Sequence, residues 1–370
     1  MHIFAILAFV LVLTFGSVTF GQRPLKEAFE GKFRVGAALN RKQFSGRDSR
    51  AAGIVTANFN TISPENVLKW ELVQPAEGKF DFSQADKYVA FGEAHKMFIV
   101  GHTLVWHNQT PKWVFEAPDG TPASKELLAK RLREHIVKVV GRYKGKIGAW
   151  DVVNEALNDD GTLRESLWLK ILGKEYISLA FKYAREADPQ ADLYYNDYSL
   201  EIAEKRKGAM ELVRWLTKEN AGISGVGTQS HHRMVWPSVD DQERTIVELG
   251  SLGLKVAVTE LDIDVLPRAS DYRGAEVTVN YGRNPRLDPF KKGFPPAQQT
   301  ALAARYAEIF GVFVRHHQLI DRVTFWCVTD ADSWLNNWPI RGRTNHPLLW
   351  DRSGRPKPAF GAVAATAEGS

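Results

Sequence analysis

The stretch WDVVNEAL, residues 150–157, joins a strand-like run to a polar ending. Its first half carries the aromatic and β-branched side chains that are typical of a buried strand, and Asn154 and Glu155 follow directly. The stretch VAVTELDI, residues 256–263, repeats the arrangement with Glu260. Carboxylates at the ends of buried strands indicate a fold in which those ends meet at one rim and present side chains to a ligand.

Short apolar runs alternate with amphipathic segments along the 370 residues. The predicted strands are residues 33–39, 59–62, 98–105, 148–153, 193–195, 225–230, 256–259 and 323–328. Between them lie helical patterns, such as the one that follows Ser124 as its N-cap. Strands that alternate with helices pair in parallel. Eight such units predict an α/β fold, a closed (β/α)8 TIM barrel, and no linker divides it, so we expect a single domain.

The N-terminal segment has the pattern of a secretory signal peptide. Residues 3–20 are apolar, and Thr19 and Gly21 suit the −3 and −1 positions of a signal-peptidase site. We therefore expect a signal peptide at residues 1–21, a catalytic barrel at residues 22–370, and secretion to the extracellular space or the periplasm without stable membrane association. The usual positive charges before the apolar run are missing, so an uncleaved anchor remains an alternative.

Composition narrows the class of protein further. Lys and Arg number 48 against 43 Asp and Glu, and the basic residues are scattered, so we expect no nucleic-acid partner. Cys327 is the only cysteine, which excludes an intrachain disulfide. The 11 Trp, 10 Tyr and 20 Phe suit either a rich core or the stacking of sugar rings on aromatic faces. We expect a monomer.

Polar and aromatic side chains close seven of the eight predicted strands at the same end. They are Glu65, Asn66, His102, Trp106, His107, Asn154, Glu155, Asn196, Asp197, Tyr198, Gln229, His231, Glu260, Asp262, Trp326, Thr329 and Asp330. A single member of this set would be read as a solvated rim residue or a core aromatic. Because the set recurs at one end of the barrel, it indicates a functional rim.

Two carboxylates on facing strands fit glycoside hydrolysis, which needs an acid for the leaving oxygen and a second carboxylate at the anomeric carbon. Glu260 and Asp262 are two residues apart, so both can face inward, and a chain Glu260–His231–Asp262 is geometrically feasible. Asn154 and Glu155 are adjacent, so both reach the site only if their strand bulges or ends there.

Seven segments carry a resemblance to a known family. They are SPENVLKWE (63–71), GHTLVWHNQTPKW (101–113), WDVVNEALND (150–159), YYNDYSLE (194–201), GVGTQSHH (225–232), VAVTELDI (256–263) and RVTFWCVTDADSWL (322–335). In this order and at these strand ends, the sequence resembles the family 10 glycoside hydrolases, the endo-β-1,4-xylanases of clan A. The resemblance covers about residues 25–360.

The resemblance implies a retaining hydrolase of β-1,4-xylan that acts by double displacement through a covalent glycosyl-enzyme. It implies Glu155 as acid/base and Glu260 as nucleophile, with Asn154, His231 and Asp262 supporting catalysis. It implies substrate contacts for Glu65, Asn66, Lys69, His102, Trp106, Gln109, Tyr198, Gln229, Trp326 and Trp334. Among these, Glu65, Asn66 and Lys69 would hold the −2 xylose, and Tyr198 would line the aglycone side. The resemblance implies no metal or organic cofactor.

Trp326 and Trp334 look like the residues that crowd the hydroxymethyl group of glucose, which would favour xylan and xylo-oligosaccharides over cellulose. Two other readings remain: another β-glucanase of clan A, which would share the glutamates, and a non-catalytic sugar-binding barrel.

The sequence departs from the family pattern at three places. Cys327 stands where the family usually has Gly, which suggests a displaced last strand, and Thr228 and His232 stand where apolar residues are commoner. Residues 264–296 form a long non-periodic segment without the cysteine pair that some members carry. We expect this loop to shape the aglycone side and to move.

Overall fold

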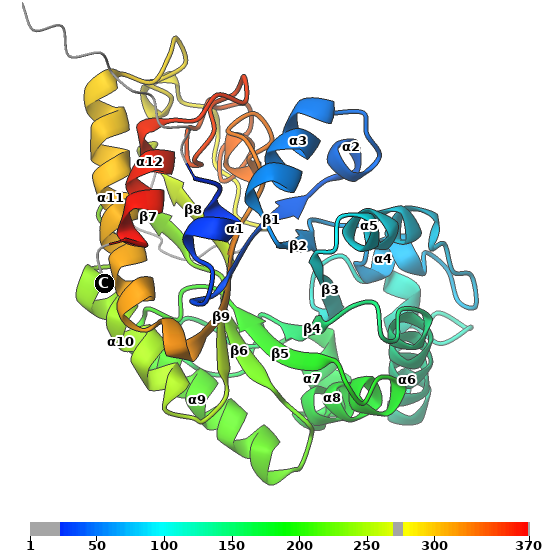
Figure 1. The fold of residues 1–370 in the computed structure, drawn as a ribbon. Coiled ribbons are helices and arrows are strands. Elements are labelled where there is room, and N and C mark those ends of the chain that lie inside the picture. The colour runs from blue at the N-terminus through cyan, green and yellow to red at the C-terminus, as the bar shows by residue number, and fades with distance from the viewer. Residues whose placement is uncertain (1–22, 269–276, 369–370) are drawn as a thin grey trace, which may run out of the picture.

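The strands form one parallel sheet that closes on itself (Figure 1). The computed structural model describes residues 23–268 and 277–368 of the chain. Its strands are β1 (Arg34–Leu39), β2 (Thr61–Pro64), β3 (Phe98–Trp106), β4 (Ala149–Asn154), β5 (Asp192–Asp197), β6 (Gly225–Thr228), β7 (His231–Arg233), β8 (Lys255–Asp264) and β9 (Ile320–Phe325). They are ordered β6-β5-β4-β3-β2-β1-β9-β8-β7, and β6 also pairs with β8, which completes the ring. The predicted (β/α)8 barrel and its single domain are confirmed.

Helices connect the strands and surround the sheet (Figure 1). The α-helices are α1 (Leu25–Ala28), α2 (Arg41–Phe44), α3 (Ser49–Asn58), α4 (Trp70–Val73), α5 (Ser83–Ala94), α6 (Lys125–Arg142), α7 (Leu167–Leu172), α8 (Glu175–Ala187), α9 (Ala203–Lys218), α10 (Val239–Gly250), α11 (Pro296–Arg315) and α12 (Pro358–Thr366). The 3₁₀ helices are η1 (Lys112–Phe115), η2 (Pro285–Leu287), η3 (His317–Leu319) and η4 (Trp334–Asn336). Ser124 caps α6 as predicted, because its hydroxyl accepts the backbone N–H of Leu127 at 3.2 Å.

All eight predicted strands are present with bounds that differ by one or more residues, and the last three of them differ in ways that affect the site. The strand predicted at residues 225–230 ends at Thr228 as β6, Ser230 has a φ of +59°, and a separate strand, β7, begins at His231. The strand predicted at residues 256–259 continues to Asp264 as β8. The last strand ends at Phe325, and Cys327 has a φ of +91°, a left-handed conformation that favours glycine. The chain therefore leaves the sheet earlier than predicted.

The core has two layers. The larger one lies between the sheet and the helices and contains most buried apolar side chains of the described residues. The smaller one groups Val100, Ala149, Tyr194 and Ala257 from four strands. Side chains of β3 and β4 pack tightly, since a Cβ atom at Gly101 would come within 2.1 Å of the Trp150 ring. Such packing keeps the strand ends in fixed positions around the rim.

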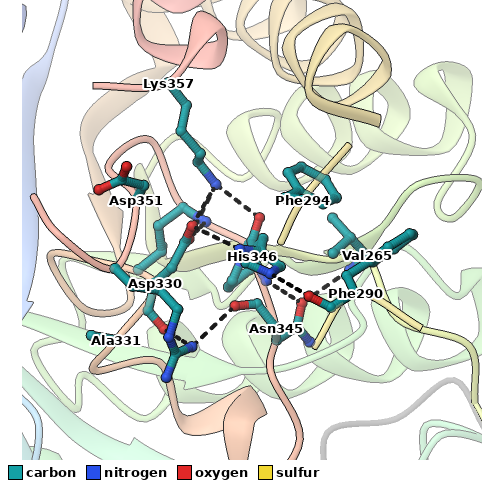
Figure 2. Close-up of polar contacts among 12 residues, drawn as sticks. Val265, Phe290, Phe294, Asp330, Ala331, Asn345, His346, Asp351 and Lys357 are labelled. Carbon is teal, nitrogen blue, oxygen red and sulfur yellow. Dashed lines mark hydrogen bonds and ion pairs between the residues drawn. The ribbon is translucent and has the colours of Figure 1, made fainter. Parts of the chain in front are cut away.

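A buried ionic cluster ties the C-terminal segment to the end of β8 (Figure 2). The Lys357 ammonium donates to both carboxylate oxygens of Asp330, at 3.1 and 2.9 Å, and to the carbonyl of His346 at 2.9 Å. The neighbouring Asn345 donates to Asp264, the last residue of β8, at 2.7 Å. All of these side chains are buried, so each charge depends on its partner.

Two sequence predictions lie outside the described residues or partly so. The signal peptide at residues 1–21 falls there, and its cleavage and the secretion of the chain stay predictions. Within residues 23–268 and 277–368, no helix is long and apolar enough to cross a bilayer. The loop at residues 264–296 is only partly described, and in residues 277–296 its one regular element before α11 is η2.

Replacing Lys357 by Met should destabilise the fold by about 3–5 kcal/mol, because the substitution leaves the Asp330 carboxylate buried without its cation. Chemical denaturation measures the loss. The matched control is Lys182→Met, which removes an exposed ion pair with Glu219 at 3.5 Å and should cost less than about 1 kcal/mol. Equal losses in the two variants would contradict the interpretation of the Asp330 cluster.

Candidate active site

A cavity of about 220 Å³ opens at the carboxyl ends of the barrel strands. It is lined by Glu65, Asn66, Lys69, His102, Trp106, Gln109, Asn154, Glu155, Gln229, His231, Glu260, Val277, Trp326 and Trp334. Every predicted site residue belongs to this set except Asp262 and Tyr198. The structure therefore brings together side chains from strands that are far apart in sequence.

Glu155 reaches the cavity because β4 ends at Asn154. Glu155 has a φ of +57°, and its backbone N–H donates to the carbonyl of Asn196 at 2.9 Å. The pairing of β4 with β5 also shifts register before this point. Adjacent residues can therefore face the same cavity, which confirms that the strand bulges and ends there. Trp106 and Gln229 then hold the carboxylate, donating to Oε2 at 2.8 Å and to Oε1 at 3.0 Å.

Glu260 lies within β8 and is held from two sides. Asn196 donates its side-chain amide to Oε1 at 2.9 Å, and His231 Nε2 lies 3.3 Å from Oε2. His231 Nδ1 in turn lies 3.0 Å from Asp262 Oδ1, and Trp334 donates to Oδ2 of the same carboxylate at 2.7 Å. The chain Glu260–His231–Asp262 is confirmed, and Asp262 acts in it from behind the cavity wall.

The two glutamates have opposite electrostatic environments. Burial raises the pKa of Glu155 above its ordinary value. Burial also opposes ionisation of Glu260, but the hydrogen bond from His231 and the charges of His102 and His231 outweigh it and hold its pKa below the ordinary value. Burial would lower the pKa of His231, yet Asp262 and Glu260 raise it to about 10, so the imidazole is a cation at neutral pH. The two environments therefore favour a proton on Glu155 and a negative charge on Glu260.

A polar network forms part of the cavity wall. Lys69 donates to Asn66 at 3.0 Å and to Gln109 at 2.9 Å. Glu65 accepts a hydrogen bond from the thiol of Cys327 at 3.4 Å. Burial raises the pKa of Glu65 to about 7, although the hydrogen bond from the Cys327 thiol acts to lower it. The cysteine that departs from the family pattern is thus in direct contact with a predicted substrate-binding residue.

Tyr198 is buried and does not line the cavity. The Lys205 ammonium lies 3.3 Å from the centre of its ring, and its hydroxyl accepts from Arg164 at 2.8 Å. Arg164, together with His107, lines a neighbouring cavity of about 370 Å³. Direct contact of Tyr198 with substrate stays a prediction, and the structure gives it a supporting position behind Arg164.

Sequence reasoning did not assign roles to Asn196 and Val277. Asn196 donates to both Asn154 and Glu260, and its place at the end of a predicted strand was the signal that could have identified it. Val277 comes from the long loop after β8 and lines the cavity, and an isolated apolar residue in a loop carries no such signal. The loop therefore contributes a side chain to the cavity, while its role on the aglycone side and its movement stay predictions. Among the described residues, no group of three or more His, Cys, Asp or Glu side chains could hold a metal ion.

A family model described as glycosyl hydrolase family 10 matches residues 24–366. The chain belongs to this family. Endo-1,4-beta-xylanase A of Xylanibacter ruminicola is 42% identical and covers 94% of this chain and 95% of its own length. Beta-1,4-xylanase of Dictyoglomus thermophilum is 39% identical over 96% of this chain and 97% of its own length.

Solved structures of the family agree with this assignment. An endoxylanase retrieved from a sugarcane soil metagenome superposes with a TM-score of 0.90 at 43% identity, covering 92% of this chain and 99% of that one. An intracellular xylanase from Thermoanaerobacterium saccharolyticum, solved as a mutant with xylotriose, gives a TM-score of 0.80 at 36% identity, covering 92% and 98%. Family membership thus rests on nearly the whole chain as well as on the site.

Replacing His231 by Gln should raise the pKa of Glu260, because it removes the cation and the charge-assisted hydrogen bond that favour the carboxylate. Carbon-13 NMR titration of labelled glutamate side chains measures this. In the unaltered protein we expect Glu260 to titrate below, and Glu155 above, the ordinary value of about 4.3. An exposed histidine provides the control, and His95→Gln should move neither carboxyl. A Glu260 titration unchanged by His231→Gln would refute the assigned role of the imidazole.

Proposed function

We propose that this chain is an endo-1,4-β-xylanase that cleaves xylan with retention of anomeric configuration. The observation that carries the proposal is the pair of glutamates at one cavity, with the pKa of Glu155 raised and that of Glu260 lowered. A retaining glycosidase needs this division, since one carboxyl must donate a proton while the other attacks.

In the first step, Glu260 attacks the anomeric carbon of the xylose that it faces. The glycosidic C–O bond breaks, the proton of Glu155 passes to the departing oxygen, and an ester forms between the sugar and Glu260. His231 and Asn196 keep the attacking carboxylate ionised and oriented. Trp106 and Gln229 aim the acid.

In the second step, the Glu155 carboxylate accepts a proton from water while the water oxygen bonds to the anomeric carbon. The ester breaks and Glu260 leaves as a carboxylate. Conversion of Glu260 to an ester removes its negative charge, which lowers the proton affinity of Glu155 and lets it act as a base. The two carboxyls therefore titrate as a coupled pair during turnover.

Xylan is the favoured substrate for two reasons. Trp326 and Trp334 line the cavity, and Trp334 is held by its hydrogen bond to Asp262. A xylose bound there would leave little room for the hydroxymethyl group of a glucose. The relatives named above are xylanases, and this chain aligns with them over nearly their full length. A non-catalytic sugar-binding barrel has no use for two carboxyls with opposed pKa shifts at one cavity.

The purified chain should release reducing sugar from β-1,4-xylan, with xylobiose and xylotriose as main products, and much less from carboxymethylcellulose or laminarin. The tryptophans at the cavity are the physical reason, because they exclude the larger glucose unit. Equal or higher rates on either glucan would refute the substrate assignment and favour a β-glucanase. No release from any of the three would favour a binding protein.

Activated substrates separate the roles of the two glutamates. In Glu155→Ala, a dinitrophenyl xylobioside should still form the glycosyl-enzyme, because its leaving group needs no acid, and the intermediate should then persist. Added azide should speed turnover and yield the β-azide. In Glu260→Ala no adduct can form, and azide should yield the α-azide. Loss of acid/base catalysis alone should lower the rate on xylan by about 10²–10⁴-fold.

Intact-protein mass spectrometry and NMR of the product anomer read the outcome. A trapped sugar adduct on Glu260→Ala, or azide products of exchanged configuration, would reverse the assignment of acid and nucleophile.

A further inference from the structure

The five residues from Thr228 to His232 join β6 to β7 and face two ways. Gln229 and His231 point into the cavity, where they contact Glu155 at 3.0 Å and Glu260 at 3.3 Å. The residues that alternate with them are buried away from it. This short segment therefore places one hydrogen-bonding partner on each catalytic glutamate.

A single carboxylate holds the back of the segment. Glu201 lies in the turn between β5 and α9 and is buried. Its Oε1 atom accepts from the Thr228 hydroxyl at 3.3 Å, from His232 Nε2 at 3.3 Å and from the Ser230 hydroxyl at 3.5 Å. Every second side chain of the segment is thus bound to the same oxygen atom.

The segment needs this support because its backbone is irregular. β6 ends at Thr228 and β7 begins at His231, and Ser230 between them has a φ of +59°, a conformation that non-glycine residues rarely adopt. A side-chain anchor on Ser230 and on both of its outward-facing neighbours restricts how this break can relax. Gln229 and His231 then keep their directions toward the cavity.

The charge state of the anchor is consistent with its geometry. Burial opposes ionisation of Glu201, but the hydrogen bonds that it accepts, first of all the one from His232, hold its pKa below the ordinary value. Burial lowers the pKa of His232, so the ring is neutral at neutral pH. A neutral ring that donates through Nε2 has an unprotonated Nδ1, which agrees with the lack of a hydrogen-bond partner at that atom among the described residues.

We propose that Glu201 is a positioning residue for both catalytic glutamates. By binding Thr228, Ser230 and His232, it fixes the backbone of the segment. The segment then directs Gln229 toward Glu155 and His231 toward Glu260. The proposal deepens the proposed function and rests on it for its kinetic consequences. Thr228 and His232 supply two of the three bonds.

Glu201→Gln keeps the size of the side chain and removes the charge, and it is the principal test. We expect kcat on xylo-oligosaccharides to fall by up to about 100-fold, the scale of loss when catalytic groups are misplaced by an ångström, while KM changes less than about three-fold. The glycosylation step should slow as well, measured by the rate at which an activated 2-deoxy-2-fluoro-xylobioside labels Glu260. His232→Leu, which removes one bond, should lie between the unaltered protein and Glu201→Gln.

A matched control separates positioning from stability. Arg185 anchors the opposite end of β6, donating to the Gly222 carbonyl at 2.8 Å and to the Ser224 hydroxyl at 3.1 Å. Arg185→Met should lower the melting temperature and leave kcat unchanged. If Glu201→Gln and His232→Leu behave in the same way, with lower melting temperatures and unchanged kcat, the anchor is only structural and the proposal is wrong. Should Glu201→Gln fail to fold, His232→Leu alone decides.

A readout without substrate keeps the proposal independent of the assigned activity. In Glu201→Gln, the pKa of Glu260 should rise toward its ordinary value as His231 loosens, while in Arg185→Met it should not change. The other charged or polar groups that face Glu260, Glu201 or His232 are unaltered in these variants: His102, Asn196, Lys69, Glu155, Asp262, Arg206 and Arg305. If the unaltered chain does not hydrolyse xylan, the proposed function fails, and this titration still decides the role of Glu201. An unmoved Glu260 would refute that role.

Discussion

The parallel pairing of β6 and β7 with one partner, β8, is the constraint on which the site depends. Thr228 pairs with Val258, and His231 pairs with Asp262. Between these two pairs, β8 has three residues (259–261), whereas the segment between β6 and β7 has two (229–230). Glu260 is the middle one of those three, and its N–H donates to the carbonyl of Gln229 at 3.0 Å. The same mismatch that interrupts the sheet brings His231 alongside both Glu260 and Asp262.

A second interruption, on the facing side of the barrel, places the other glutamate. β4 stops at Asn154, and the left-handed conformation of Glu155 turns its side chain toward the rim. Asn196 links the two interruptions, since its amide donates to Asn154 and to Glu260 while its carbonyl accepts the N–H of Glu155. Left-handed backbone at a non-glycine residue costs free energy, and the packed barrel around it supplies the rigidity that maintains it.

Much of the fold and the site followed from two periodicities. Alternation along a strand placed Glu260 and Asp262 on one face, and eight strand–helix units implied a closed barrel with a common rim. What escaped prediction depends on backbone geometry that no pattern encodes. Nothing in the amino-acid sequence indicates that the strand would break at Ser230. Nor does it indicate that Tyr198 would be buried with its hydroxyl bound to Arg164 and would not line the cavity. Val277 escaped because an apolar residue in a loop looks the same whether it lines a site or not.

The closure of the sheet has a consequence for how the protein is made. β1 pairs on one side with β2 and on the other with β9, so the first of the strands to be synthesised completes its ladder with the last. The Asp330 carboxylate follows β9, and its ion-pair partner Lys357 is synthesised 27 residues later, so this buried pair forms after the last strand has been made. Synthesis proceeds from the N-terminus, and the barrel cannot close before its final strand has left the ribosome. During translation the outer edge of β1 therefore stays unpaired, and an unpaired strand edge is the kind of surface that chaperones protect.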